Sequence, residues 1–298
     1  MPELYRIEKL EYDVTNECNL KCDQCDHLAP FFNGGDTEFN RSINLEEFSR
    51  QLMLLAKHLH TNSFWILGGE PLLQKQLLDY LACLRSSGIT DKIVLVTNGL
   101  MLAQQPDALF HAVDKIMISL YSSTPIPQQS LHKIVRRCET ARVELGFFSK
   151  SHFRKTIVAK RNDDPHQVGL IFQTCTNAWN WHCHAIHDGH LYRCATAPIL
   201  GYRLHHEGLV ERDFRKDDGL KLEDSPELGD RIREYLSSSI PLESCFYCVG
   251  CVGKLVRHRQ LSKKEIEEKT WIRSTVANSL DKWKAFRKFS RWRLIGQR

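Results

Sequence analysis

Short apolar runs and alternating positions recur along the first half of the chain. Apolar and charged residues alternate over residues 10–14, and runs rich in aliphatic, β-branched and aromatic residues follow at 63–67, 93–97, 115–119 and 143–148. Both patterns predict β-strands. The intervening stretches have helical spacing and end signals, which predict helices over about 44–60, 74–87, 106–112 and 127–138.

This alternation predicts an α/β fold with a parallel sheet, because a strand followed by a helix normally pairs in parallel with the next strand. The sheet is either doubly wound or curled into a full or partial barrel, and in both cases functional residues lie at the carboxyl ends of the strands. After Arg161 the alternation stops. We therefore expect a core domain over 1–165, possibly continuing to about 172, a second domain over 166–253 and a tail over 254–298.

Charge is distributed unevenly along the chain. The formal net charge is +5, and residues 254–298 carry fourteen Lys and Arg against four Asp and Glu, which leaves the remainder at −5. Apolar tail positions step by three, so on a helix they wind around the axis. We expect a basic helical tail that docks on the protein or on a partner. A nucleic-acid or membrane arm stays open as the alternative because aromatic anchors lie among the basic residues, at Trp271, Trp283, Phe286, Phe289 and Trp292.

The chain contains no run of about 18 apolar residues that could span a membrane, and its first residues are charged. These features predict a soluble, cytoplasmic protein. Its eleven cysteines then serve metals or catalysis more readily than disulfides, because a reducing compartment keeps thiols free. Cys83 and Cys138 lie alone inside helical patterns, and we expect them to pack as small apolar residues.

Cys18, Cys22 and Cys25 follow the first predicted strand at spacings of four and three residues. Three thiolates in such a loop can hold a [4Fe-4S] cluster whose fourth iron stays open for a substrate or cofactor. A zinc site is the alternative, but zinc knots usually pair two Cys-x2-Cys units, and here only Asp26 or His27 would supply a fourth ligand. The loop therefore predicts a reactive iron-sulfur cluster.

Two motifs point to a known family. Asn16-Glu-Cys18-Asn-Leu-Lys-Cys22-Asp-Gln-Cys25 resembles the signature of the radical S-adenosylmethionine (SAM) superfamily, and Gly68-Gly69-Glu70-Pro71 resembles its second motif. The resemblance implies a partial (β/α) barrel in which SAM chelates the open iron and its amino group meets Gly68, Gly69 and Glu70. It also implies SAM contacts at the next two strand ends, from Thr97-Asn98-Gly99 and Ser119. Gln24 departs from the pattern, since relatives often have an aromatic residue near adenine at that place.

A second group of cysteines resembles the accessory domain called twitch in the SPASM/twitch branch of the superfamily. Gly189-His-Leu-Tyr-Arg-Cys194 matches its Gly-x4-Cys element. The resemblance implies an auxiliary [4Fe-4S] cluster that is held by Cys175, Cys194, Cys245 and Cys248. Cys183 is a possible substitute for Cys175. A zinc site stays the alternative, because zinc accepts mixed Cys and His ligands and four histidines lie nearby in the sequence, at His182, His184, His187 and His190. If the histidines do not bind zinc, we expect them to line the substrate pocket.

Cys251 is one cysteine more than a four-ligand cluster needs. The arrangement resembles radical SAM epimerases of aminoglycoside biosynthesis, the neomycin C epimerase type. The resemblance implies that a 5′-deoxyadenosyl radical removes hydrogen from an unactivated sugar carbon and that Cys251 returns hydrogen to the opposite face. The substrate is then a small carbohydrate, and the partner is an electron donor such as flavodoxin or ferredoxin. A nucleic-acid partner is not expected.

Three other functions stay open. If Cys251 is a ligand or a packing residue, the substrate radical loses a proton and an electron, and the enzyme is a dehydrogenase of a sugar or aminocyclitol alcohol. A peptide-modifying maturase is the second, although such enzymes often carry a leader-binding domain ahead of the first strand. A non-enzymatic iron-sulfur electron-transfer protein is the third. Four residues follow the first cysteine cluster, namely Asp26, His27, Phe31 and Phe32. We expect them either to face the substrate or to lie on a surface loop.

Overall fold

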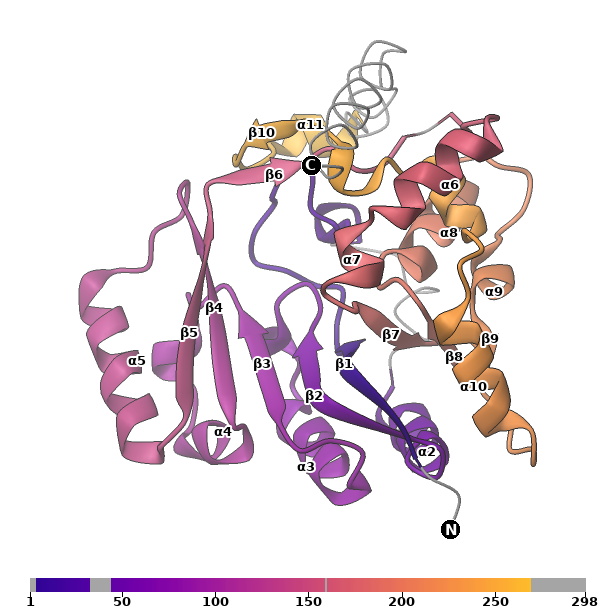
Figure 1. Ribbon diagram of the computed structural model, residues 1–298. Helices are drawn as coiled ribbons and strands as arrows, with labels where there is room; N and C mark the ends of the chain where they lie inside the picture. The colour runs from indigo at the N-terminus through magenta and orange to yellow at the C-terminus, as the bar shows by residue number, and fades with distance from the viewer. Residues whose placement is uncertain (1–3, 33–43, 159, 269–298) are drawn as a thin grey trace, which may run out of the picture.

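A computed structural model describes residues 4–32, 44–158 and 160–268 of the chain (Figure 1). Strands and helices alternate through its first half as predicted. The strands are β1 (Tyr5–Asp13), β2 (Leu59–Leu67), β3 (Ile93–Thr97), β4 (Lys115–Tyr121) and β5 (Glu144–Lys150). The helices between them are α2 (Leu45–Leu55), α3 (Leu77–Ser87), α4 (Asp107–Ala112) and α5 (Gln128–Ala141).

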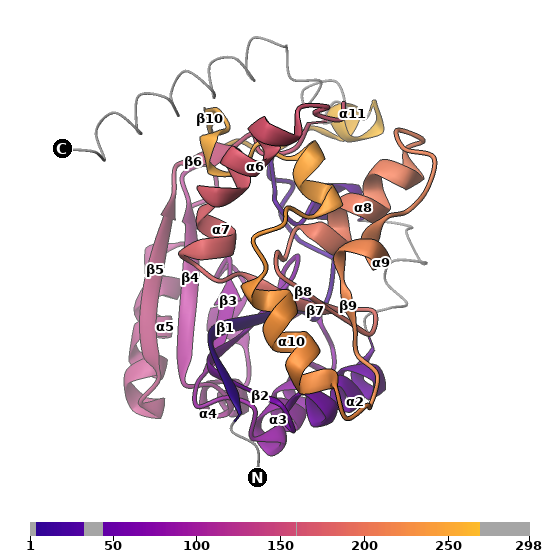
Figure 2. The ribbon, with the colours of Figure 1, turned by 45° about the vertical axis from the view of Figure 1, so that its right-hand side comes forward.

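The strands form one mostly parallel sheet. Each strand from β1 to β5 pairs in parallel with the next one along the chain. Helices α2 to α5 lie along one side of this curved sheet (Figures 1 and 2). The expected α/β fold, a parallel partial (β/α) barrel, is therefore confirmed.

Helix α2 ends at Leu55 and β2 begins at Leu59, both earlier in the chain than the sequence pattern predicted. The reason is the register of the sheet: Tyr5 at the start of β1 pairs with Leu59, so β2 follows β1 over its whole length. The start of α2 is as expected, because the Asn44 side chain accepts a hydrogen bond of 2.8 Å from the Glu47 amide.

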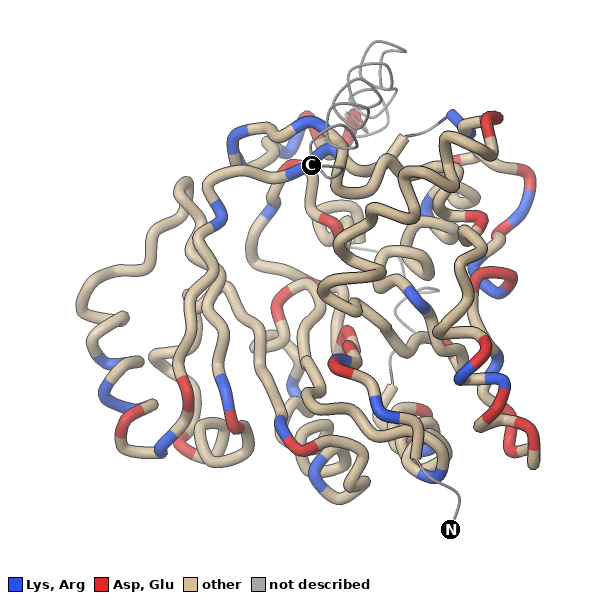
Figure 3. The backbone as a smooth tube through the Cα atoms, viewed as in Figure 1, with Lys and Arg blue, Asp and Glu red and all other residues tan. Residues whose placement is uncertain are grey.

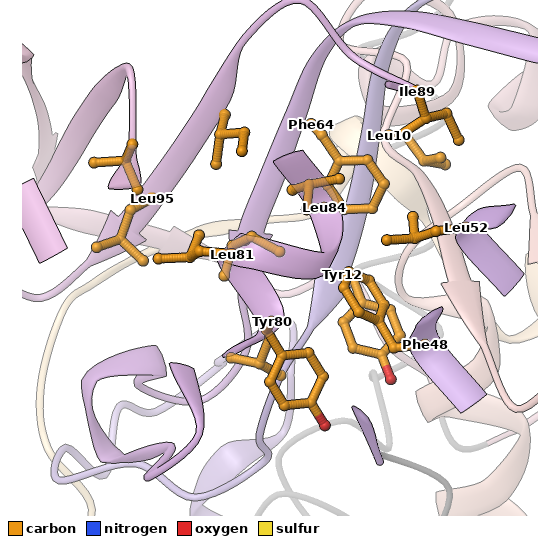
Figure 4. Packing of buried hydrophobic residues seen from close by; sticks show 14 of the residues in the cluster. Leu10, Tyr12, Phe48, Leu52, Phe64, Tyr80, Leu81, Leu84, Ile89 and Leu95 are labelled. Atoms are coloured by element: carbon orange, nitrogen blue, oxygen red, sulfur yellow. The ribbon is translucent and has the colours of Figure 1, made fainter. Parts of the chain in front are cut away.

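The main hydrophobic core lies between the sheet and its covering helices. Tyr12 of β1 packs on Phe48 of α2, with ring centroids 4.3 Å apart, and Phe48 lies 5.2 Å from Tyr80 of α3 (Figure 4). Cys138 is buried in this core and Cys83 packs against it, which confirms their expected packing role. Burial of this apolar surface is the main source of stability.

The opposite face of the sheet is polar and aromatic. Lys9 and Glu11 lie on it because alternate residues of β1 point to opposite faces. Lys9 Nζ lies 2.6 Å from Glu11 Oε1 and 4.6 Å from the centre of the Trp65 ring on β2. Trp65 in turn stacks on Phe148 of β5, with ring centroids 6.2 Å apart. We call this the inner face.

The region after Arg161 continues the same sheet. Strand β7 (His184–His187) pairs in parallel with β1, and β8 (His190–Tyr192) and β9 (Leu220–Lys221) follow in antiparallel pairing. Its helices are α6 (Pro165–Gln173), α7 (Thr176–Trp179), α8 (Ala197–His206), α9 (Arg215–Asp218) and α10 (Leu228–Ser237). Acidic and basic positions both occur along α10 (Figure 3). Short 3-10 helices occur at η1 (Ala29–Phe31), η2 (Pro71–Leu73), η3 (Leu102–Gln104), η4 (Glu243–Tyr247) and η5 (Gly250–Val252).

The described part of the predicted helical tail is partly extended. Strand β10 (Leu255–Arg257) pairs in antiparallel fashion with β6 (His152–Arg154), and the short helix α11 (Lys263–Glu267) follows. The aromatic positions from Trp271 onward lie outside the described residues. Within the ranges that the structure describes, every helix is too short or too polar to cross a membrane.

Candidate functional site

The carboxyl ends of the first strands surround one cavity of about 200 Å³. Most residues predicted to bind the first cluster and SAM line it, namely Cys18, Cys22, Cys25, Gly68, Gly69, Glu70, Asn98 and Ser119, whereas Gly99 is not among the residues that line it. Thr97 lines the cavity as well. The strand-end position agrees with the general rule for parallel α/β folds.

The loop after β1 brings the three thiols to the cavity wall. Gln24 and Leu28 have positive φ angles of 61° and 50°, which turn the chain around the site. None of the three cysteines forms a disulfide. Burial raises the pKa of Cys18 to about 12 and that of Cys22 to about 11, and it raises the pKa of Cys25 as well. Such thiols stay neutral until a metal centre supplies positive charge, so they fit a [4Fe-4S] cluster.

Gly68 and Gly69 are required by close backbone packing. A Cβ atom on Gly68 would lie 2.2 Å from the Thr15 carbonyl oxygen, and one on Gly69 would lie 2.2 Å from that of Glu17. The Gly69 amide donates to the Thr15 carbonyl at 2.8 Å, and the Glu70 amide donates to the Glu17 carbonyl at 2.7 Å. The two glycines therefore hold the end of β2 against the chain that enters the cysteine loop.

Glu70 is buried, and its carboxylate joins two strand ends. Its oxygens accept hydrogen bonds from the Thr97 hydroxyl at 2.6 Å, the Asn98 amide at 2.8 Å and the Leu72 amide at 3.2 Å. Burial outweighs these bonds and raises its pKa to about 7. The Asn98 side chain donates to Asn19 Oδ1 at 2.6 Å, which ties the end of β3 to the cysteine loop. Contact of Glu70 with the SAM amino group stays a prediction.

Other polar and aromatic residues complete the cavity wall. Asp26 and His27, expected at the substrate or on a surface loop, line it. His27 Nδ1 lies 2.9 Å from Asp13 Oδ2; burial opposes its charge, but Asp13 raises the pKa of His27 to about 9. Phe32 is buried in a second apolar cluster that includes Tyr202 instead of lining the cavity. Phe31 lines a smaller neighbouring pocket.

Sequence reasoning missed the wall contributed by the later strands. Tyr121, Phe148, Lys150 and Phe153 all line the cavity. The available signal was the alternation of β4 and β5: Tyr121 lies two residues after Ser119, and Lys150 lies two residues after Phe148. Because Ser119 pairs with Phe148 and Tyr121 with Lys150, these side chains share one face of the sheet.

Four cysteines of the second region, Cys175, Cys194, Cys245 and Cys248, lie close enough to one another to affect each other's pKa. Burial raises the pKa of Cys194, and the nearby sulfurs of Cys175 and Cys248 raise it further. Burial likewise raises the pKa of Cys245, with a further contribution from Cys194 and Cys175. Each of the four is buried enough for its thiol pKa to rise. The residues predicted for the auxiliary cluster are thus neighbours and fit such a group, although the cluster itself stays a proposal.

Cys183 and Cys251 make other contacts. Lys9 Nζ on the inner face donates to Cys183 Sγ at 3.2 Å. The Cys251 thiol donates to the Thr174 carbonyl oxygen at 2.8 Å, next to Cys175. Among the described residues that line the cavity, neither cysteine is found.

The four histidines of the zinc alternative lie along β7, β8 and the segment before them. His184 Nδ1 is 3.2 Å from the Arg193 carbonyl oxygen, and His190 Nδ1 is 2.6 Å from that of Asp188. None of the four lines the described cavity. In the parts of the chain that the structure describes, no three His, Cys, Asp or Glu side chains form a site for a single metal ion.

Comparison with curated proteins finds GTP 3′,8-cyclases. The enzyme of Staphylococcus carnosus is 33% identical over 171 residues, which cover 55% of this chain and 50% of the relative. That of Aquifex aeolicus is 31% identical over 169 residues, which cover 53% and 50%. The chain thus spans about half the length of the curated relatives it matches.

Comparison with solved structures finds BtrN in complex with AdoMet and 2-DOIA, at 15% identity and a TM-score of 0.43. The match covers 85% of this chain and 96% of that one. Another is a histidine-tagged form of anSMEcpe with bound AdoMet, at 12% identity and a TM-score of 0.42, covering 94% and 98%. Residues 12–146 match the model of the Radical SAM superfamily.

Proposed function

We propose that this chain is a radical SAM enzyme that removes a hydrogen atom from a carbon of a small carbohydrate. The observation that carries the proposal is a single cavity lined both by the thiols of Cys18, Cys22 and Cys25 and by the strand-end residues Glu70 and Asn98. An electron-transfer protein would need the thiols but would have no use for an adjoining ligand cavity. The shared cavity therefore favours catalysis.

Cys18, Cys22 and Cys25 would hold a [4Fe-4S] cluster, which with bound SAM supplies a 5′-deoxyadenosyl radical when a donor such as flavodoxin or ferredoxin provides an electron. The chain itself contributes binding and orientation. Glu70 fixes the turn at Thr97, and polar atoms at the ends of β3 and β4 face the cavity. These groups are pre-positioned by the backbone, which reduces the entropy lost on binding.

The remaining walls suit a polar ring compound. The acidic side chain of Asp26 and the basic side chains of His27 and Lys150 offer hydrogen-bond acceptors and donors. The rings of Phe148 and Phe153 offer flat apolar surfaces. Aromatic surfaces with a few polar groups are typical of small-molecule sites, and here they match the C–H faces and the hydroxyl or amino groups of a sugar. An amino sugar or aminocyclitol is therefore the proposed substrate class.

The fate of the substrate radical depends on Cys251. Transfer of a hydrogen atom from its thiol to the opposite face of the carbon gives an epimer and a thiyl radical, which one electron and one proton restore. If the radical carbon carries a hydroxyl group, loss of the hydroxyl proton and of one electron from the carbon gives a ketone instead. Cys251 donates to the Thr174 carbonyl oxygen and does not line the described cavity, which favours dehydrogenation. The second cluster would accept the electron. Epimerisation would require η5 to bring Cys251 to the substrate.

The test is incubation of reconstituted enzyme with SAM and reductant in D2O, separately with GTP and with each member of a panel of aminoglycosides and aminocyclitols. A product two mass units lighter identifies dehydrogenation. An epimer with one deuterium, lost in Cys251→Ala and kept in the matched Cys183→Ala variant, identifies epimerisation. Formation of 5′-deoxyadenosine should disappear in Cys18→Ala. If wild type neither binds nor cleaves SAM, the enzyme proposal is wrong; if it converts GTP alone, the carbohydrate class is wrong.

A further inference from the structure

The C-terminal segment 257–261 lies along the loop that carries Cys22. The Asp23 amide donates to the Arg259 carbonyl oxygen at 3.0 Å, and the Leu261 amide donates to the Lys21 carbonyl oxygen at 2.7 Å. These two bonds flank an antiparallel bridge between Cys22 and Gln260. A residue from the far end of the described chain therefore lies opposite a predicted cluster ligand.

The side chain of Gln260 contacts the sulfur of that ligand. Gln260 Nε2 lies 3.4 Å from Cys22 Sγ and 3.5 Å from Ser123 Oγ, and Gln260 Oε1 accepts from the Lys21 amide at 2.5 Å. A backbone N–H can only donate, so the oxygen of the Gln260 amide must face Lys21. The amide nitrogen, which can only donate, is therefore the atom turned toward Cys22 Sγ.

The segment is fixed from several sides, so the contact does not depend on one side chain. Arg259 Nε lies 3.0 Å from Asp23 Oδ2, and its guanidinium also reaches Glu265 at 2.8 Å. Strand β10, just before it, pairs with β6. Cys18 Sγ, by contrast, accepts a hydrogen bond from within its own loop, from the Leu20 amide at 3.4 Å. Gln260 thus provides a long-range donor to the first site.

We propose that Gln260 is a positioning residue that raises the reduction potential of the first cluster through its hydrogen bond to Cys22 Sγ. This inference rests on the proposed function. Reduction adds negative charge to the cluster and its sulfurs, so a hydrogen-bond donor stabilises the reduced form more than the oxidised form. The bond makes electron transfer to this cluster easier, and the segment that supplies it couples the C-terminal region to radical formation.

The experiment is a redox titration of the reconstituted full chain, followed by the EPR signal that changes when SAM is added. Gln260→Leu keeps the approximate size of the side chain and removes the donor. Gln260→Glu keeps an oxygen acceptor for the Lys21 amide and also removes the donor. Both variants should titrate at a lower potential than wild type. Arg259→Ala, the matched control, removes the ion pair with Asp23 but leaves the sulfur contact, and it should titrate like wild type.

Each outcome decides the matter. A lower potential in both Gln260 variants, with wild-type potential in Arg259→Ala, supports the inference. Wild-type potential in both Gln260 variants overturns it, as does a shift confined to Gln260→Glu, which would come from charge alone. A shift of equal size in Arg259→Ala also overturns it, because the segment would then act by packing. If wild type has no SAM-responsive signal, the proposed function fails rather than this inference.

Discussion

The carboxylate of Glu70 accepts a hydrogen bond of 2.6 Å from the hydroxyl of Thr97, which joins the end of β2 to the end of β3 at the cavity. The same carboxylate accepts from the Asn98 amide. A buried acceptor that serves several donors is hard to replace, because each donor left without it costs free energy. Two neighbouring strand ends are thus held in one arrangement by a single side chain.

Glu70→Gln should weaken SAM binding. The new NH2 group would face a backbone or hydroxyl donor, so one of the hydrogen bonds at the strand ends is lost. We expect Kd for SAM, measured by equilibrium dialysis with the reconstituted protein, to rise about tenfold, which corresponds to about 1.4 kcal/mol. Glu144→Gln is the matched control on exposed surface, where Glu144 pairs with Lys92 and Lys115. Equal Kd values for both variants and wild type would contradict this role.

Gly69→Ala should destabilise the fold. The added Cβ would lie 2.2 Å from the Glu17 carbonyl oxygen, and the backbone atoms around it leave no room. We expect a loss of at least about 2 kcal/mol in the free energy of unfolding, measured by urea denaturation. Gly169→Ala in α6, whose Cβ would meet nothing within 4 Å, should be neutral or stabilising by about 0.5–1 kcal/mol. The reverse order of stabilities would refute the packing argument.

Cys248→Ala and Cys251→Ala should differ in iron content. Cys248 lies among the four neighbouring cysteines of the second region, whereas the Cys251 thiol is engaged with the Thr174 carbonyl oxygen. Wild type and Cys251→Ala should each hold about eight iron atoms per chain, and Cys248→Ala about four. Chemical iron analysis and Mössbauer spectra measure this. Loss of iron in Cys251→Ala would make that residue a ligand and remove it as a hydrogen donor.

Tyr80 should make stability fall at alkaline pH. Burial raises its pKa from 10.0 to about 12, so the folded protein keeps a proton that the unfolded chain has lost. This stabilisation is complete below pH 10 and disappears as pH rises toward 12. Tyr80→Phe, which keeps the ring, should therefore lose less stability than wild type between pH 9.5 and 11.5, by on the order of 1 kcal/mol. Parallel pH profiles of the two proteins would show that Tyr80 does not titrate this way.

Local patterns predicted the order of strands and helices in the first half of the fold, but not every boundary. Strands β3 and β4 and the cysteine loop follow from short-range alternation and spacing, and the glycine motif at 68–69 placed the cavity correctly. The start of β2 was missed, because residues 59–62 become a strand only through pairing with β1. Tertiary pairing of this kind overrides local preference.

The second region was harder to predict because its contacts are non-local. Strand β7 is only four residues long and contains two histidines, so its addition to the main sheet has no periodic signal. The contact of Gln260 with Cys22 spans 238 positions in the sequence. A glutamine in a basic, polar stretch indicates nothing about a sulfur partner until the backbone pairing at residues 21–23 is known.

The parallel pairing of β7 with β1 has a consequence for any attempt to divide the protein. A fragment that stops at residue 165 would lack β7, and one side of β1 would then present free amide and carbonyl groups. Open strand edges of this kind recruit other chains and promote aggregation. The cysteine-rich region therefore also protects the edge of the sheet, because its strand β7 pairs with β1. A soluble core fragment would need another strand in the place of β7.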